Sequence, residues 1–209
     1  MDFKKFLVGL VLILPLLLAG CGTTSPAAQT VERLKAGGYV IFMRHMATDH
    51  SKEDTDVKNL ERCEAQRNLS EEGREDARFV GEAMRTLAIP VSQILVSPYC
   101  RTIESAELVF DSDFTVEDSL MHLKSVEGSD LEITYTASLR QFLATVPESA
   151  TNLVLVGHEV NHRRVSDALI AEGEMAIYQP DGQGGFNLIG TVKVEDWREI
   201  MRAQTTAAP

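Results

Sequence analysis

The segment Tyr39-Val-Ile-Phe-Met-Arg-His-Met46 decides the fold of this chain. Tyr39 to Met43 is an apolar run rich in residues that favour strands, and Gly37-Gly38 precedes it. Such a run is typical of a buried strand in a parallel sheet. The run ends at Arg44-His45, so a cation and an imidazole lie where the chain leaves the sheet. Open α/β sheets bind ligands beyond the carboxyl ends of their strands, and we therefore expect a site there.

Two further apolar runs end in the same manner. Asn152-Leu-Val-Leu-Val-Gly-His158 ends on a histidine, and Ile94-Leu-Val-Ser-Pro-Tyr-Cys-Arg101 delivers an arginine. The three strand ends therefore offer two arginines and two histidines. Because guanidinium groups suit the oxygens of a phosphate, this set predicts a pocket for a phosphate dianion.

These motifs are similar to those of a known family. Arg44-His45, Ser97-Pro98-x-x-Arg101 and Val156-Gly157-His158, in this order, resemble the histidine phosphatase (phosphoglycerate mutase-like) superfamily. The resemblance covers about residues 38–169. It implies an α/β fold, a three-layer α/β/α sandwich with a mostly parallel central sheet.

The resemblance also implies a role for each motif residue. His45 would be the nucleophile and would form a phosphohistidine, which water then hydrolyses. Arg44 and Arg101 would bind the phosphoryl oxygens, and His158 would supply a further hydrogen-bond donor. This chemistry needs no metal and no other cofactor. The expected partner is a small phosphorylated substrate.

Two features depart from the usual family pattern. Met46 stands where the family usually has glycine, so its side chain either points away from the phosphate or narrows the pocket, and we include it among the candidate substrate contacts. Glu159 follows His158, which resembles the His-Asp pair of the phytase-like branch. A carboxyl group beside a bound dianion has a raised pKa and can donate a proton, so Glu159 is the predicted acid and Asn161 a predicted substrate contact.

Other interpretations remain open at this stage. Glu127 and Asp130 are alternative proton donors. The segment His158-Glu-Val-Asn-His162 matches the His-Glu-x-x-His pattern of zinc metallohydrolases, which requires both histidines on one continuous helix. A third possibility is a lipoprotein that binds a phosphorylated ligand without turning it over.

The N-terminus predicts export. A basic start, an apolar stretch and the ending Leu18-Ala-Gly-Cys21 resemble a bacterial lipoprotein signal, with residues 1–20 removed and Cys21 lipidated. We expect 21–29 to be a flexible tether, 30–202 one histidine phosphatase-like domain, and 203–209 a frayed tail. Gly22 after the cysteine favours the outer membrane, so the predicted location is the cell envelope, at the periplasmic face of that membrane.

Charge and cysteine content narrow the partners. The formal net charge is −11, which argues against nucleic acid as a partner. The expected membrane contact is through the lipid on Cys21. The sequence indicates no obligate protein partner. In an oxidising compartment, Cys63 and Cys100 are candidates for a disulfide that would hold the long polar loop 47–68 beside Arg101.

The remaining pattern predicts the other elements. Ser70 should cap a helix that ends near Pro90, and further helices are expected over 31–36, 99–110, 133–146 and 161–170. A closing antiparallel pair of strands is expected over 174–178 and 186–194, with a short strand over 114–116.

Overall fold

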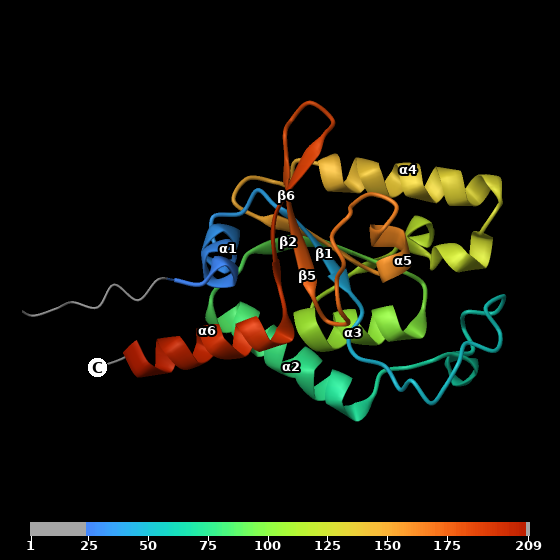
Figure 1. Ribbon diagram of the computed structural model, residues 1–209, viewed down its shortest axis with the longest axis horizontal. Helices are drawn as coiled ribbons and strands as arrows, with labels where there is room; N and C mark the ends of the chain where they lie inside the picture. The colour runs from blue at the N-terminus through green and yellow to red at the C-terminus, as the bar shows by residue number, and fades with distance from the viewer. Residues whose placement is uncertain (1–23, 208–209) are drawn as a thin grey trace, which may run out of the picture.

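The structure, a computed structural model, describes residues 24–207. A six-stranded sheet lies between two layers of helices (Figure 1). Its spatial order is β3-β2-β4-β1-β5-β6. The strands are β1 Val40–Arg44, β2 Val91–Val96, β3 Thr115–Val116, β4 Asn152–Gly157, β5 Met175–Pro180 and β6 Phe186–Val192. The pairs among β1 to β4 are parallel and β5 and β6 are antiparallel, so the predicted fold class is confirmed.

Helices cover both faces of the sheet. They are α1 Pro26–Leu34, α2 Glu71–Thr86, α3 Cys100–Phe110, α4 Asp130–Ala144, α5 Glu159–His162 and α6 Val194–Ala207. One apolar core contains residues of α1, α2, α3 and α6, and the other contains residues of α4. Three short 3₁₀ helices join these elements: η1 Cys63–Ala65, η2 Asp118–Leu120 and η3 Leu123–Val126. No helix within residues 24–207 is long and apolar enough to cross a bilayer.

The central strands are buried on both faces, as their apolar runs predict. In β1, Ile41 and Met43 pack into the first core, whereas Val40 and Phe42 pack into the second. Side chains alternate between the two faces of a strand, so one apolar run serves both cores. All of β4 is buried in the same manner.

Strand pairing brings two predicted motifs together. β1 lies beside β4 in parallel, and Arg44 is in register with Gly157. A histidine follows each of these strands, His45 after β1 and His158 after β4. The His45 backbone N–H donates to the Gly157 carbonyl at 3.0 Å. The sheet register therefore places His45 and His158 at the same edge.

The structure corrects several predicted boundaries. Helix α1 begins at Pro26, because Ser25 accepts a hydrogen bond from the Ala28 N–H and caps it, so the segment 21–29 is helical from Pro26 onward instead of a tether. Helix α6 runs through Ala207, which makes most of the predicted frayed tail helical. The helix predicted over 161–170 ends at His162. The predicted signal sequence and the lipidation site Cys21 lie outside the described residues.

The long loop 47–68 is fastened to the first turn of α3. A disulfide joins Cys63 to Cys100 across 37 residues of sequence, which confirms the bridge expected for an exported protein. Beside it, the buried Gln66 side chain accepts a hydrogen bond from the Cys100 backbone N–H at 3.0 Å. The loop is therefore held against the helix that carries Arg101.

Removing this disulfide should lower the stability of the fold. A cross-link over a loop of this length restricts the unfolded chain, so Cys63→Ser/Cys100→Ser should lower the free energy of unfolding by about 4 kcal/mol. Urea titration of the variant and of the parent protein measures the loss. Reduction of the parent protein by dithiothreitol should reproduce it and leave the variant unchanged. An unfolding midpoint that the substitution does not move would contradict the prediction.

Candidate active site

His45 lies at the end of β1 and is buried, with 2% of its surface exposed. Its Nδ1 atom is 2.9 Å from the Met46 carbonyl oxygen. A carbonyl oxygen can only accept, so Nδ1 carries the proton and Nε2 keeps a free lone pair. Burial first, and then the charges of Arg101, Arg44 and Arg67, hold the pKa of His45 well below its usual value. The imidazole is therefore neutral at neutral pH, which is the form that a nucleophile requires.

His158 lies beside His45, with ring centroids 5.5 Å apart. Its Nε2 atom is 2.8 Å from the hydroxyl oxygen of Ser97, at the end of β2, and its buried Nδ1 has no hydrogen-bond partner among the described residues. Burial also holds the pKa of His158 well below its usual value. If the Ser97 hydroxyl donates to Nε2, then Nδ1 carries a proton that is free to bind an anion.

Three arginines gather near His45. Arg101, in the first turn of α3, is 99% buried in its side chain, whereas Arg44 and Arg67 are 21% and 27% exposed. In all three the Nε atom is buried without a hydrogen-bond partner among the described residues. Buried donors are rarely left unpaired, so three in one place indicate a site for an anion. The sequence patterns indicated Arg44 and Arg101 but not Arg67.

The carboxylate of Glu172, between α5 and β5, contacts two of these arginines. It is 3.3 Å from Arg44 Nη2 and 3.9 Å from Arg67 Nη2. It also accepts hydrogen bonds from the backbone N–H and the hydroxyl of Thr48, at 3.1 and 2.9 Å, and lies 3.2 Å from His50 Nε2. One carboxylate therefore joins the strand end at Arg44 to the loop that carries Arg67.

A second carboxylate, from the same loop, orients Arg101. Asp54 Oδ1 accepts a hydrogen bond from Arg101 Nη1 at 3.0 Å and another from the Arg67 backbone N–H at 2.9 Å. The guanidinium carbon of Arg101 lies 4.4 Å from the centre of the Tyr99 ring. Both contacts fix the plane of the guanidinium group.

Two predicted substrate contacts have other surroundings. The Met46 side chain is fully buried and packs in the first core instead of facing substrate. A Cβ atom at Gly173 would lie 3.2 Å from Met46 Cε, so the glycine leaves room for it. Asn161 is 1% exposed, and its amide binds the backbone of Leu120, Met121 and Leu123. Its polar atoms are therefore occupied, and Asn161 positions that backbone instead of facing substrate.

The predicted acid Glu159 does not join the arginine cluster. Its carboxylate is 3.5 Å from Arg163 Nε, and it lines a separate pocket with Lys124 and Arg164. The carboxylates that do contact the clustered arginines are Asp54 and Glu172. The reserve candidates Glu127 and Asp130 are exposed at the end of η3 and the start of α4.

His122, to which no sequence motif drew attention, lies against the active site. Its ring centroid is 4.8 Å from that of His158 and 5.9 Å from that of Tyr99. Burial, followed by the charge of Arg101, lowers the pKa of His122 to about 4. This ring forms one side of the pocket at neutral charge.

The His-Glu-x-x-His segment does not have the geometry of a metal site. His158 has an extended backbone and precedes α5, so the two histidines are not on one helix. The Nε2 atom of His162 lies 2.6 Å from the Tyr178 hydroxyl, on the side of the second core. Each Nε2 is thus bonded to a different hydroxyl. Within residues 24–207, no group of three or more metal-ligating side chains is found.

His122 and His162 make the stability of the fold sensitive to acid. Burial lowers the pKa of His162, like that of His122, to about 4. The unfolded chain binds protons near pH 6.5 whereas the folded protein does not, so stability should fall as the pH drops from about 6.5 to about 4. Each of the two groups accounts for up to about 3 kcal/mol, because one pKa unit corresponds to about 1.4 kcal/mol.

Urea titration at a series of pH values measures this slope. His162→Gln should make it shallower, because glutamine can still bond to Tyr178 but cannot be protonated in this range. An identical slope in the parent protein and the variant would show that His162 is not one of the groups responsible.

The fold and the motifs agree with those of known proteins. The sequence profile described as Histidine phosphatase superfamily (branch 1) matches residues 40–163. Among solved structures, the protein histidine phosphatase SixA in complex with tungstate aligns at 17% identity and a TM-score of 0.52, over 76% of this chain and 98% of the other. A phosphoserine phosphatase from Entamoeba histolytica in complex with 3-phosphoglyceric acid aligns at 11% identity and 0.53, over 76% and 98%.

A third structure, the mycobacterial glucosyl-3-phosphoglycerate phosphatase, aligns at 13% identity and a TM-score of 0.51, over 72% of this chain and 96% of the other. No curated protein sequence matches. At such low identities the structural likeness supports the fold alone. The profile, however, covers more than half of the chain, from the first residue of β1 to the residue after α5. The chain therefore belongs to the histidine phosphatase superfamily.

Proposed function

We propose that this protein is an extracytoplasmic phosphomonoesterase that works through a phosphohistidine on His45 Nε2. One observation carries the proposal: a neutral, buried imidazole with a free Nε2 lies among three arginines whose buried Nε atoms have no partner in the described chain. An arrangement of this kind binds a phosphoryl group and presents a nucleophile to it. Other members of the family act through a histidine intermediate, which supports the same chemistry.

The reaction takes place in two steps. His45 Nε2 attacks phosphorus, the bond to the leaving oxygen breaks, and that oxygen takes up a proton from solvent. Water then attacks the phosphohistidine, which releases inorganic phosphate and restores the imidazole. Arg44, Arg67 and Arg101 neutralise the charge on the phosphoryl oxygens in both steps, and the Nδ1–H of His158 adds a hydrogen bond.

The carboxylates near the site favour a second candidate substrate, a phosphorylated histidine, because neither of them is free to protonate a leaving group. Asp54 and Glu172, the carboxylates that contact the clustered arginines, are both engaged in ion pairs. Substrates with good leaving groups need little protonation by the enzyme. Phosphohistidine is one of them when its second ring nitrogen is protonated, because the leaving group is then neutral imidazole. The chain shares its fold with a structure described as a protein histidine phosphatase. Comparing phenyl phosphate with p-nitrophenyl phosphate tests the point: a much slower reaction of the phenyl ester indicates that no efficient acid is present.

The extracytoplasmic location is a further part of the proposal. The lipoprotein-like ending Leu18-Ala-Gly-Cys21 supports it, and so does the disulfide, because disulfides persist in oxidising compartments. Labelling of the expressed protein with radioactive palmitate should depend on Cys21. Equal labelling of Cys21→Ser would overturn the assignment.

The test of the chemistry is to trap the intermediate. The full-length protein, mixed briefly with p-nitrophenyl phosphate in EDTA, should carry a phosphoryl group on the peptide that contains His45, stable in base and labile in acid. Phosphate release without such an intermediate would overturn the mechanism. Phosphate binding without turnover of any ester would favour the alternative of a binding lipoprotein.

A further inference from the structure

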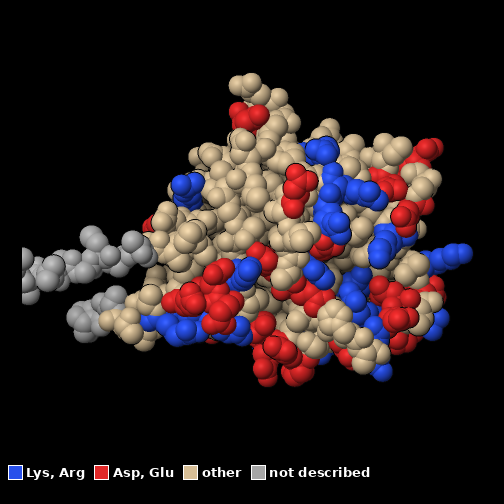
Figure 2. Space-filling model, viewed as in Figure 1, with Lys and Arg blue, Asp and Glu red and all other residues tan. Residues whose placement is uncertain are grey.

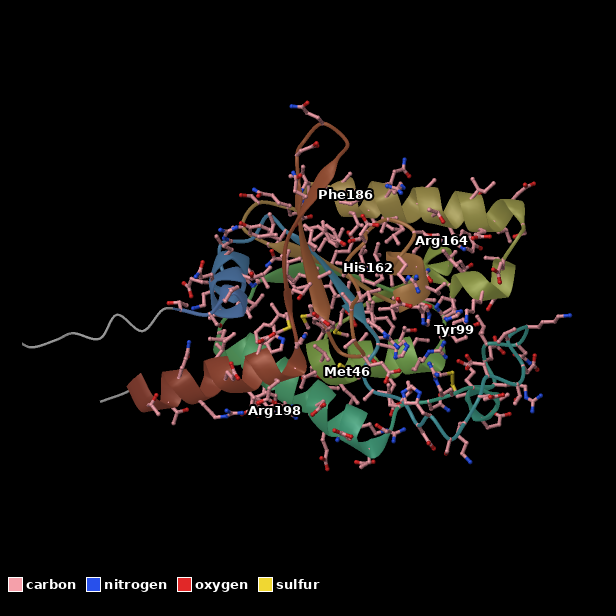
Figure 3. All side chains as sticks on the ribbon, in the orientation of Figure 1. Met46, Tyr99, His162, Arg164, Phe186 and Arg198 are labelled. Carbon is pink, nitrogen blue, oxygen red and sulfur yellow. A yellow bond between two sulfur atoms is a disulfide. The ribbon has the colours of Figure 1, made fainter. Side chains whose placement is uncertain are left out.

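A cationic pocket of about 330 Å³ has in its wall Glu159, the residue that directly follows His158. Its wall consists of Lys124 in η3, of Glu159 and Val160 in α5, and of Arg163 and Arg164, which follow α5. The cations of this pocket are Lys124, Arg163 and Arg164. In Figure 2, blue side chains gather on the same part of the molecule, and Figure 3 places Arg164 between α4 and α5.

The cations of this pocket exceed the carboxylates that pair with them. Arg163 is 3.5 Å from Glu159, and Arg164 is 2.5 Å from Glu132. Lys124 is exposed and has no ion-pair partner within residues 24–207. The chain as a whole has a formal net charge of −11, so a local excess of positive charge is a specific feature rather than a general one. It suits an anionic group.

The pocket adjoins the phosphate site through two histidines. Glu159 directly follows His158, and Lys124 is two residues after His122, whose ring packs on that of His158 at 4.8 Å. The charge of Lys124 contributes to the lowered pKa of His122, which also indicates that the two side chains are near each other. Asn161 binds the backbone of Leu123 and fixes this arrangement.

We infer that the cationic pocket binds a second anionic group of the substrate. This inference rests on the proposed function. The substrate class is then a small phosphomonoester that carries a carboxylate or a second phosphate a few bonds from the phosphoryl group. The phosphoryl group lies among Arg44, Arg67 and Arg101, and the second anion passes the edge of His122 to reach Lys124 and Arg163.

Matched phosphonates test the inference without turnover, because the carbon–phosphorus bond is not hydrolysed. Calorimetry on the full-length protein in detergent would compare phosphonopropionate with propylphosphonate, and the pair one methylene longer. In at least one pair the carboxylated ligand should bind about tenfold more tightly, as expected for two exposed ion pairs. The difference should disappear in Lys124→Gln/Arg163→Gln. It should persist in Arg33→Gln, which removes an exposed arginine of α1.

The outcomes separate the two proposals. Equal affinity within both pairs, or a difference that survives the double substitution, would overturn the second anion site and leave the phosphate site intact. Failure of every phosphonate to bind would overturn both, because the phosphate site itself would then be absent. Hydrolysis of p-nitrophenyl phosphate, which lacks a second anionic group, reports on the proposed function independently.

Discussion

Replacing His45 with alanine should lower kcat for p-nitrophenyl phosphate by about 10⁴-fold or more, since removal of an enzyme's nucleophile has an effect of this size. The imidazole is buried, its Nδ1–H is held by the Met46 carbonyl, and its Nε2 is free. The neighbouring His158 cannot take over this role if Ser97 donates to its Nε2, because its Nδ1 then carries the proton and has no free lone pair. Initial rates in EDTA measure the effect.

Two controls make the result for His45→Ala interpretable. Added imidazole should restore part of the activity, because it can occupy the space of the missing ring and accept the phosphoryl group. The variant should still bind phosphate with an affinity close to that of the parent protein, as the three arginines remain. Activity equal to that of the parent would rule out His45 as the nucleophile.

The second large effect is expected at Arg101. Arg101→Lys keeps the charge but loses the planar fork that contacts Asp54 and stacks on Tyr99. Because a phosphoryl group in the transition state needs two aligned donors, kcat/KM should fall by about 10²- to 10³-fold. Steady-state kinetics with p-nitrophenyl phosphate measure this, and the loss should fall mainly on kcat.

The matched control for Arg101→Lys is Arg33→Lys on α1, which should have no effect on either constant. Thermal unfolding of Arg101→Lys shows whether the buried ammonium group destabilises the fold. A variant that folds normally and retains the parent kcat/KM would contradict the assignment of Arg101 as a phosphate ligand.

The strands and the motif residues could be predicted because each signal is local. An apolar run that ends on Arg44-His45 or on His158 indicates both a strand and a site, and parallel pairing then brings the strand ends together. The disulfide could be predicted because the N-terminal sequence indicates export to an oxidising compartment, and Cys63 and Cys100 are the two cysteines other than Cys21. The sequence also carries a signal for the helix α6, because Val194, Trp197 and Met201 recur at helical spacing, and all three pack on the first core.

The loop residues of the site could not be predicted in the same way. Arg67, Asp54 and Glu172 reach the site through the path of two irregular segments, and that path depends on tertiary contacts such as those of Gln66 and Cys63. No periodicity marks such residues. The orientation of Met46 likewise depends on the space left by Gly173, more than a hundred residues away.

The pairing of β1 with β4 fixes the positions of the two active-site histidines relative to each other. Neighbouring strands lie about 4.8 Å apart, so the pairing fixes the backbone separation of His45 and His158, whose ring centroids are 5.5 Å apart. Segment 117–129 supplies His122 and Lys124, which we infer to lie along the path of a second anionic group. This segment could therefore be exchanged with that of a relative without altering the pairing or the arginine cluster, whereas segment 47–68 could not, because it carries Arg67 and the Asp54 that orients Arg101.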